Sequence, residues 1–190
     1  MSDNDISLSG STVNGSFTGH DDNSYTFSNA YERSTYLQDL YDKFQQEKKD
    51  NPELQELCEE LDYFNSLIEN EEMIGLENKL TAGNRQKIIS YALNVKEKFH
   101  KKLMKTSQYS SVAQDINVYI LAKVRRSFMM EVYTLICDNA PEERINLLIT
   151  ERIINPVKAE LGLNIFKYDE DDIMGMIFFL TGNCHLKWTT

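Results

Sequence analysis

The stretch that decides the fold is Tyr168-Asp-Glu-Asp-Asp-Ile-Met-Gly-Met-Ile-Phe-Phe-Leu-Thr-Gly-Asn-Cys-His-Leu-Lys-Trp188. Asp169 is placed to cap a helix, and the acids that follow it suit the positive end of the helix dipole. We expect Gly182 or Asn183 to end this helix in the left-handed conformation. The last residues to Trp188 are then expected to run extended against the body. The inward stripe of this helix is formed by Ile173, Met176, Ile177 and Leu180.

Helical spacing of apolar residues predicts further helices in the preceding part of the chain. The expected spans are 30–49, a helix that starts at Asn51-Pro52-Glu53, about 84–105, about 112–138, and one that starts at Pro141. The span 112–138 is the most apolar, so we expect it to be central and largely buried. We expect Pro156 to break or restart the helix before it. The predicted fold is mostly α, a bundle of about five to six helices.

The first 29 residues differ in composition from the rest. Residues 1–29 are rich in Ser, Thr, Asn, Asp and Gly and contain no Lys or Arg. One interpretation is a disordered polar tail. The other is a short β-prone leader, because Ile6-x-Leu8 and Tyr25-x-Phe27 have the spacing of strands. Such strands would be completed by other copies of the chain or by a partner, so we predict self-association through residues 1–29, followed by a helical domain over 30–190.

The overall composition excludes several classes of function. A formal net charge of −10 and a pI of about 4.8 disfavour general binding to nucleic acids or anionic membranes. Cys58, Cys137 and Cys184 are widely spaced and odd in number, which favours a reducing compartment over a disulfide framework. The amino-terminal residues have no signal-peptide pattern, and no apolar run approaches the length of a membrane span. We therefore expect a cytoplasmic protein that does not contact membranes.

Several residues are candidates for catalysis or metal binding. Cys184 and His185 suggest a nucleophile and a base, but adjacent residues rarely meet usefully, and structural packing is favoured. The acids Asp169–Asp172 could bind a hard cation, yet they lack the spacing of a calcium loop and are explained by helix capping. No nucleotide-binding or acyl-transfer motif occurs. We predict no catalytic residue, no metal and no cofactor, hence no enzyme; activity lost on replacing Cys184 or His185 would reverse this.

Contacts with protein partners are the remaining interpretation. An acidic strip on the helix that starts at Asn51 and a basic strip over residues 96–105 would orient such partners. Aromatic side chains are also more numerous than a small core needs. The candidate partner-binding residues are Ile177, Phe178, Trp188, Glu56, Glu59 and Glu60. The basic strip is interpreted first as a solvated face or a complement to the chain's own acids, and nucleic acid is expected only indirectly or through this local basic helix. Its lysines are Lys98, Lys101, Lys102 and Lys105.

The segment Tyr168–Trp188, above all Leu180-Thr-Gly-Asn-Cys-His-Leu-Lys-Trp188, resembles the shared C-terminal domain of bacterial ABC-three-component conflict systems. The polar leader Ile6–Gly15 also resembles short β-leaders of bacterial defence proteins. These systems, including those called Lamassu, pair an SMC-like ATPase with an effector nuclease or peptidase and a small accessory component. The resemblance implies an accessory or adaptor subunit of an anti-phage or anti-plasmid complex, which bridges or restrains the ATPase and the effector. It carries over no catalytic residue.

A second hypothesis comes from charge alone. An acidic protein of this kind could act like an antitoxin or regulator that masks the basic surface of a partner. Under this hypothesis, reversing the charges of the acidic helix after Asn51 should abolish binding. Under the adaptor hypothesis, changes around Ile177 and Trp188 should matter more.

Overall fold

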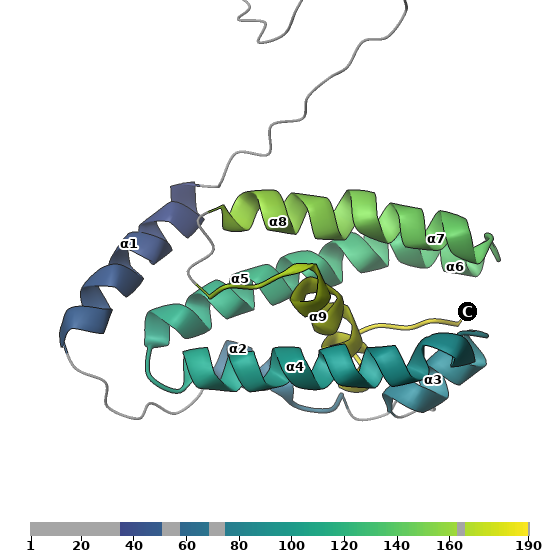
Figure 1. Ribbon diagram of the computed structural model, residues 1–190, viewed down its shortest axis with the longest axis horizontal. Helices are drawn as coiled ribbons and strands as arrows, with labels where there is room; N and C mark the ends of the chain where they lie inside the picture. Colours follow the sequence, from purple (N-terminus) through teal and green to yellow (C-terminus); the bar gives the residue numbers. More distant parts are fainter. Residues whose placement is uncertain (1–34, 51–57, 69–74, 163–165, 190) are drawn as a thin grey trace, which may run out of the picture.

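The computed structural model describes residues 35–50, 58–68, 75–162 and 166–189, and these residues are mostly helical (Figure 1). No strand occurs among them. The predicted β-prone leader over 1–29 lies outside the described residues, so its prediction stays open. The predicted α fold is confirmed.

The helical elements follow one another along the chain with short connections. The elements are α1 (Thr35–Asp50), α2 (Glu59–Asn65), α3 (Leu76–Ala82), a 3-10 turn (Gln86–Ile88) leading into α4 (Ile89–Ser107), α5 (Ser111–Ser127), a π-helical turn (Phe128–Val132), α6 (Tyr133–Cys137), α7 (Glu142–Ile149), a second π-helical turn (Thr150–Ile154), α8 (Asn155–Leu161) and α9 (Glu170–Gly182).

The expected count of five to six helices was wrong, because the described residues form seven continuous helical rods. The additional rod is α3, a short segment that begins after Gly75, whose φ of 91° few other residues adopt. Pro156 does not break the fifth predicted helix. A π-helical turn precedes this proline, and the rod continues through it as α8.

The most deeply buried helix of the fold is α9, while α5 of the span 112–138 is central as the sequence predicted, because it packs against α1, α2, α4 and α9. Figure 1 shows α9 crossing between the α4 rod and the roughly aligned rods α5–α6 and α7–α8. Ten of its 13 residues are buried, because the helix is apolar on nearly all sides. The span 112–138 buries one face only; seven of the 17 residues of α5 are buried.

The helices α9 and α4 approach each other closely in the core. A Cβ atom built on Gly175 would lie 2.4 Å from the carbonyl oxygen of Val95 and 2.7 Å from the Cβ of Phe99. Only glycine therefore fits at this crossing. The absence of a side chain at Gly175 is what lets the two backbones touch.

The end of α9 differs from the prediction. Neither Gly182 nor Asn183 takes the left-handed conformation; Cys184 does, with a φ of 66°. The backbone N–H of His185 donates to the carbonyl of Leu180 at 2.8 Å, which closes a Schellman motif. This turn directs the following residues back onto the core, where Leu186 and Trp188 are buried as expected.

Candidate functional site

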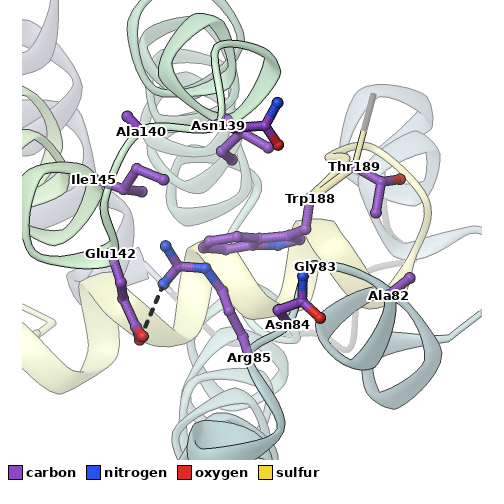
Figure 2. Close-up of a pocket in the computed structure, with 11 residues that line it drawn as sticks. Ala82, Gly83, Asn84, Arg85, Asn139, Ala140, Glu142, Ile145, Trp188 and Thr189 are labelled. Atoms are coloured by element: carbon purple, nitrogen blue, oxygen red, sulfur yellow. Dashed lines mark ion pairs between the residues drawn. The ribbon is translucent and has the colours of Figure 1, made fainter.

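A pocket of about 350 Å³ lies beside Trp188 (Figure 2). Three separate segments meet there: the end of α3, the turn between α6 and α7, and the C-terminal segment after α9. Its lining residues are Ala82, Gly83, Asn84, Arg85, Ile136, Asn139, Ala140, Glu142, Ile145, Trp188 and Thr189. The pocket therefore depends on the whole fold and not on one local motif.

Arg85 joins these segments. Its guanidinium carbon lies 4.7 Å from the centre of the Trp188 ring, and a guanidinium nitrogen donates to Asn146 Oδ1 at 3.1 Å. Glu142 lies 3.7 Å away. Burial lowers the pKa of Arg85 and the carboxylate of Glu142 opposes this shift. Arg85 thus acts as a charged clamp between α7 and the C-terminal segment.

Trp188 is held on its other sides by the core. Its ring contacts Phe128 edge-on at 5.1 Å and stacks with Phe178 at 6.3 Å. The indole N–H donates to Thr181 Oγ1 at 2.9 Å, and that hydroxyl donates to the carbonyl of Ile177 at 2.8 Å. These contacts fasten the C-terminal segment to α9 and to the π-helical turn that follows α5.

Burial changes how three predicted partner-binding residues are interpreted. Ile177 and Phe178 are 0% exposed, and Trp188 is 3% exposed. In this fold they present almost no surface to another protein. We expect them to affect partner binding only through the shape of the pocket and the packing beneath it.

Cys184 and His185 both serve the fold. Cys184 is buried at the left-handed turn after α9. The ring of His185 packs against Tyr63 at 4.8 Å and Phe64 at 5.4 Å, at the end of α2. Asn183 fastens the same helix end, because its side-chain amide donates to the carbonyl of Phe64 at 2.9 Å.

Charge and burial also act on His185. Burial and the nearby positive charge of Arg125 lower the pKa of His185, while the carbonyls of Tyr63, Phe64 and Ser66 oppose the shift. Neutral histidine is therefore the form that suits this position.

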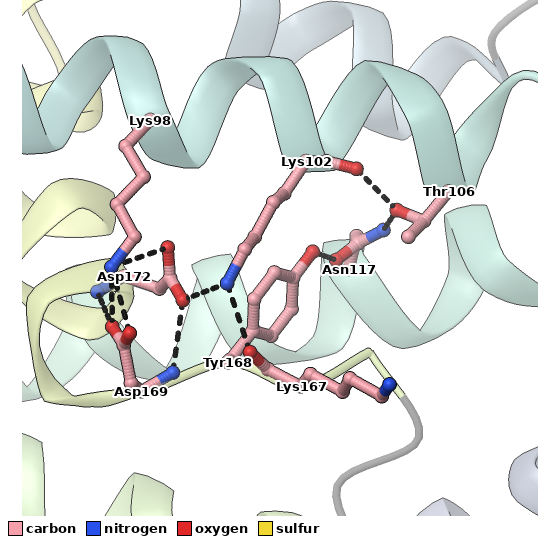
Figure 3. A network of polar contacts seen from close by, with 8 residues as sticks. All are labelled: Lys98, Lys102, Thr106, Asn117, Lys167, Tyr168, Asp169 and Asp172. Atoms are coloured by element: carbon pink, nitrogen blue, oxygen red, sulfur yellow. Dashed lines mark hydrogen bonds and ion pairs between the residues drawn. The ribbon is translucent and has the colours of Figure 1, made fainter.

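A polar network joins the start of α9 to α4 (Figure 3). Asp169 accepts from the backbone N–H of Asp172 and Asp172 accepts from that of Asp169, each at 2.9 Å, so the predicted helix cap is confirmed as a capping box. Lys98 donates to Asp169 at 2.7 Å. Lys102 donates to the buried Asp172 and, at 2.9 Å, to the carbonyl of Lys167.

The network continues into the core through Tyr168. Its hydroxyl donates to Asn117 Oδ1 at 2.8 Å, and the amide of Asn117 donates to Ser107 Oγ at 3.1 Å. Burial raises the pKa of Tyr168, so the phenol stays a donor. Every link here ties α4, α5 and α9 together, which indicates a structural role.

The pKa values of several groups at the start of α9 and beside it are shifted. Partial burial pushes the pKa of Asp169 upward, but its hydrogen bonds with Lys98 and Asp172 outweigh this and lower the pKa to about 2. The hydrogen bond to Asp169 raises the pKa of Lys98. Nearby, burial and the hydrogen bond to Asp171 raise the pKa of Tyr91 to about 12.

The lysines of the predicted basic strip have different surroundings in the fold. Lys98 and Lys102 pair with the cap of α9, and Lys101 pairs with Glu97 at 3.3 Å on its own helix. Lys105 is exposed. The interpretation of these lysines as a complement to the chain's own acids accounts for three of them. A nucleic-acid contact stays a prediction that would rest on the exposed Lys101 and Lys105.

The predicted acidic strip is on the surface where it is described. Glu59 and Glu60 are exposed on α2, whereas Glu56 lies outside the described residues. Burial raises the pKa of Asp115 on α5, and the carboxylates of Glu60 and Glu47 add to the shift. Acids from α1, α2 and α5 therefore form one negative surface.

Sequence reasoning missed the clamp formed by Arg85, Glu142 and Asn146. The available signal was the single arginine that follows Gly83-Asn84, but nothing local shows what it meets 57 to 61 residues later. Within the described ranges, no group of three or more His, Cys, Asp or Glu side chains could hold a metal ion. Among the same residues, no helix has both the length and the apolar character needed to cross a bilayer.

One comparison with known proteins gives a match. The family model of C-terminal domain 9 of the ABC-three component systems matches residues 75–188, which include α3 to α9 and Trp188. No curated protein and no solved structure matches the chain.

Proposed function

Because the chain belongs to the family of C-terminal domain 9 of the ABC-three component systems, we propose that it is a non-catalytic accessory subunit of a bacterial anti-phage or anti-plasmid defence complex. A system of several components implies protein partners. The proposed partners are an SMC-like ATPase and an effector nuclease or peptidase, which the chain bridges or restrains in the cytoplasm.

One observation supports this proposal above the others. Most reactive and polar residues of the matched C-terminal segment lie in contacts or turns that hold the fold. Cys184 forms the turn, His185 packs on α2, Asp172 binds the lysines of α4, and Trp188 is clamped by Arg85. A segment built in this way supplies a rigid surface for other proteins, which is what an adaptor requires.

The pocket beside Trp188 is the proposed contact for one partner. It is open at the surface, and polar groups of Asn84, Asn139 and Glu142 stand at its rim. A partner segment that enters it would meet the exposed polar groups of the rim, whose positions are fixed from beneath by the contact of Arg85 with the buried indole. Rigid aromatic groups surrounded by polar ones are typical of productive contact sites.

The test is co-purification. The tagged full-length chain is co-expressed with the products of the reading frames next to its gene, and we expect it to retain the ATPase and the effector. Cys184→Ala and His185→Phe variants that stay folded should retain both partners. A folded wild-type chain that ignores these proteins, or that turns over a substrate alone, would contradict the proposal.

A matched pair of variants tests the pocket. Ala82 is exposed at its edge, whereas Ala122 is exposed on α5 outside the pocket. We expect Ala82→Arg to reduce recovery of one partner and Ala122→Arg to leave recovery unchanged. Equal recovery with both variants would show that the pocket is not the contact.

The acidic surface supports the alternative of an antitoxin-like protein that masks a basic partner. Glu59, Glu60 and Asp62 are exposed together on α2, and the carboxylates of Glu60 and Glu47 add to the effect of burial that raises the pKa of Asp115. Reversing Glu59 and Glu60 to Lys should abolish binding under this alternative. It should leave the recovery of the ATPase largely intact under the adaptor proposal.

A further inference from the structure

A second open surface lies on the hairpin formed by the α5–α6 rod and α7. Met130 is 70% exposed and Leu147 is 57% exposed, the two most exposed large apolar side chains among the described residues. They border a groove of about 390 Å³ lined by Met130, Glu131, Thr134, Leu135, Arg144, Leu147, Leu148 and Glu151. We call this surface the hairpin groove. Its apolar centre is left uncovered in the single chain.

Both π-helical turns contribute to the hairpin groove. Met130 and Glu131 belong to the turn Phe128–Val132, and Glu151 belongs to the turn Thr150–Ile154. Arg152 of the second turn pairs with Glu131 of the first at 3.2 Å. A π-helical turn is a rare interruption of an α-helix, and such turns occur frequently at functional sites. Two such turns that contact each other beside the exposed Met130 therefore indicate a functional surface.

Two of the charges that line the groove, Arg144 and Glu151, are arranged symmetrically about Leu147 and Leu148. Arg144 lies three residues before Leu147, and Glu151 lies three residues after Leu148. With a rise of about 1.5 Å per residue, the two charges are about 10 Å apart along the axis, on either side of the leucine pair. Within the part of the chain that the structure describes, neither Arg144 nor Glu151 has an ion-pair partner.

This pattern complements itself. A two-fold axis that passes between Leu147 and Leu148 would place an antiparallel copy of α7 on the groove. Arg144 of each copy would then meet Glu151 of the other, and the leucines would face one another. A two-fold interface requires that a surface fit its own copy in this way.

We propose that the hairpin groove is the dimer interface of this protein, and that its occupant is α7 of a second copy. The dimer buries the exposed apolar side chains of Met130 and Leu147 and forms two symmetric Arg144–Glu151 pairs. Because one helical hairpin offers a small area, the dimer is a reversible one. It would give the accessory subunit two sets of partner contacts, although the inference does not depend on the proposed function.

The test measures self-association of the full-length chain by sedimentation velocity across the micromolar to millimolar range. Wild-type protein should shift from monomer to dimer as its concentration rises. Arg144→Glu alone or Glu151→Arg alone turns two attractive pairs into two repulsive ones and should weaken the dimer by about tenfold. Arg144→Glu combined with Glu151→Arg restores the complementary pattern and should recover association.

Leu147 provides the apolar test and Leu93 its matched control. Leu147→Glu should abolish the dimer, whereas Leu93→Glu, on an exposed position of α4 that is 39% accessible, should leave it unchanged. Monomer at every concentration would overturn the proposal. So would a dimer that survives Leu147→Glu, because that result places self-association elsewhere, including residues 1–29.

Discussion

Replacing Gly175 by alanine is the perturbation that most directly probes the packing of α9 on α4. The added methyl group gains about 1 kcal/mol of helix propensity. It also meets the backbone of Val95 at 2.4 Å and the Cβ of Phe99 at 2.7 Å, about 1 Å inside ordinary van der Waals contact. One of these atoms is in the backbone and the other is the Cβ of the buried Phe99, so neither can move aside, and α4 and α9 must separate. Overpacking of this kind costs about 1–3 kcal/mol or more.

Gly182 is the internal control on the same helix. A methyl group there meets the Nζ of Lys96 at 2.7 Å and its Cε at 3.1 Å, which are the far end of a flexible side chain and can move away. We therefore expect Gly182→Ala to change the free energy of unfolding by less than about 0.5 kcal/mol. We expect Gly175→Ala to lower it by about 2 kcal/mol.

Urea unfolding at equilibrium measures both variants, followed by circular dichroism and by the fluorescence of Trp188, the one tryptophan of the sequence. The difference between the two variants is more informative than either value. Equal stabilities for the two variants would refute the close approach of α9 and α4, and so would a Gly175→Ala protein more stable than wild type.

Three further outcomes are expected. Thr181→Val leaves the buried indole N–H of Trp188 without its acceptor, and it should lower the free energy of unfolding by about 1–3 kcal/mol in the same urea titration. An unchanged unfolding midpoint would contradict this hydrogen bond. Asp169 has its pKa lowered from 3.8 to about 2, so it stabilises the fold above about pH 4, and this contribution is lost as the pH falls toward 2. Because its side chain is 57% exposed, the contribution is at most about 1 kcal/mol. Asp169→Asn should remove that part of the pH dependence in thermal unfolding curves. His185 has a lowered pKa, so its neutral form stabilises the fold above about pH 6.5, and stability should fall as the pH drops below that value. A His185→Phe protein should not show this loss. If both proteins lose stability equally with falling pH, the pH dependence originates elsewhere.

Local signals in the sequence were enough to predict the start of α9. Asp169 followed by three acids is the pattern of a capped helix, and the capping box with Asp172 has that form. The helical fold class also followed from apolar spacing. The prominence of α9 over the span 112–138 did not, because both are apolar and only the assembled fold shows which one lies between the others.

Contacts between distant segments could not be predicted in the same way. The pairing of Lys98 and Lys102 with the acids of α9 joins residues about 70 positions apart, and charge type alone does not select a partner. Cys184 takes a left-handed conformation that glycine or asparagine would adopt more easily. It is held there by the hydrogen bond from the backbone of His185 to Leu180 and by the packing of the His185 ring on α2, and the second of these contacts is a property of the tertiary structure.

Holding other proteins is the function that we propose for this chain. The most direct measurement is the mass of the complex formed when the purified chain is mixed with the ATPase and the effector encoded beside its gene, compared with a folded Cys184→Ala, His185→Phe double variant. We predict one assembly that contains all three proteins, with the same mass for wild type and variant. Separate proteins in the wild-type mixture, or catalysis by the chain alone that the double variant lacks, would contradict the claim.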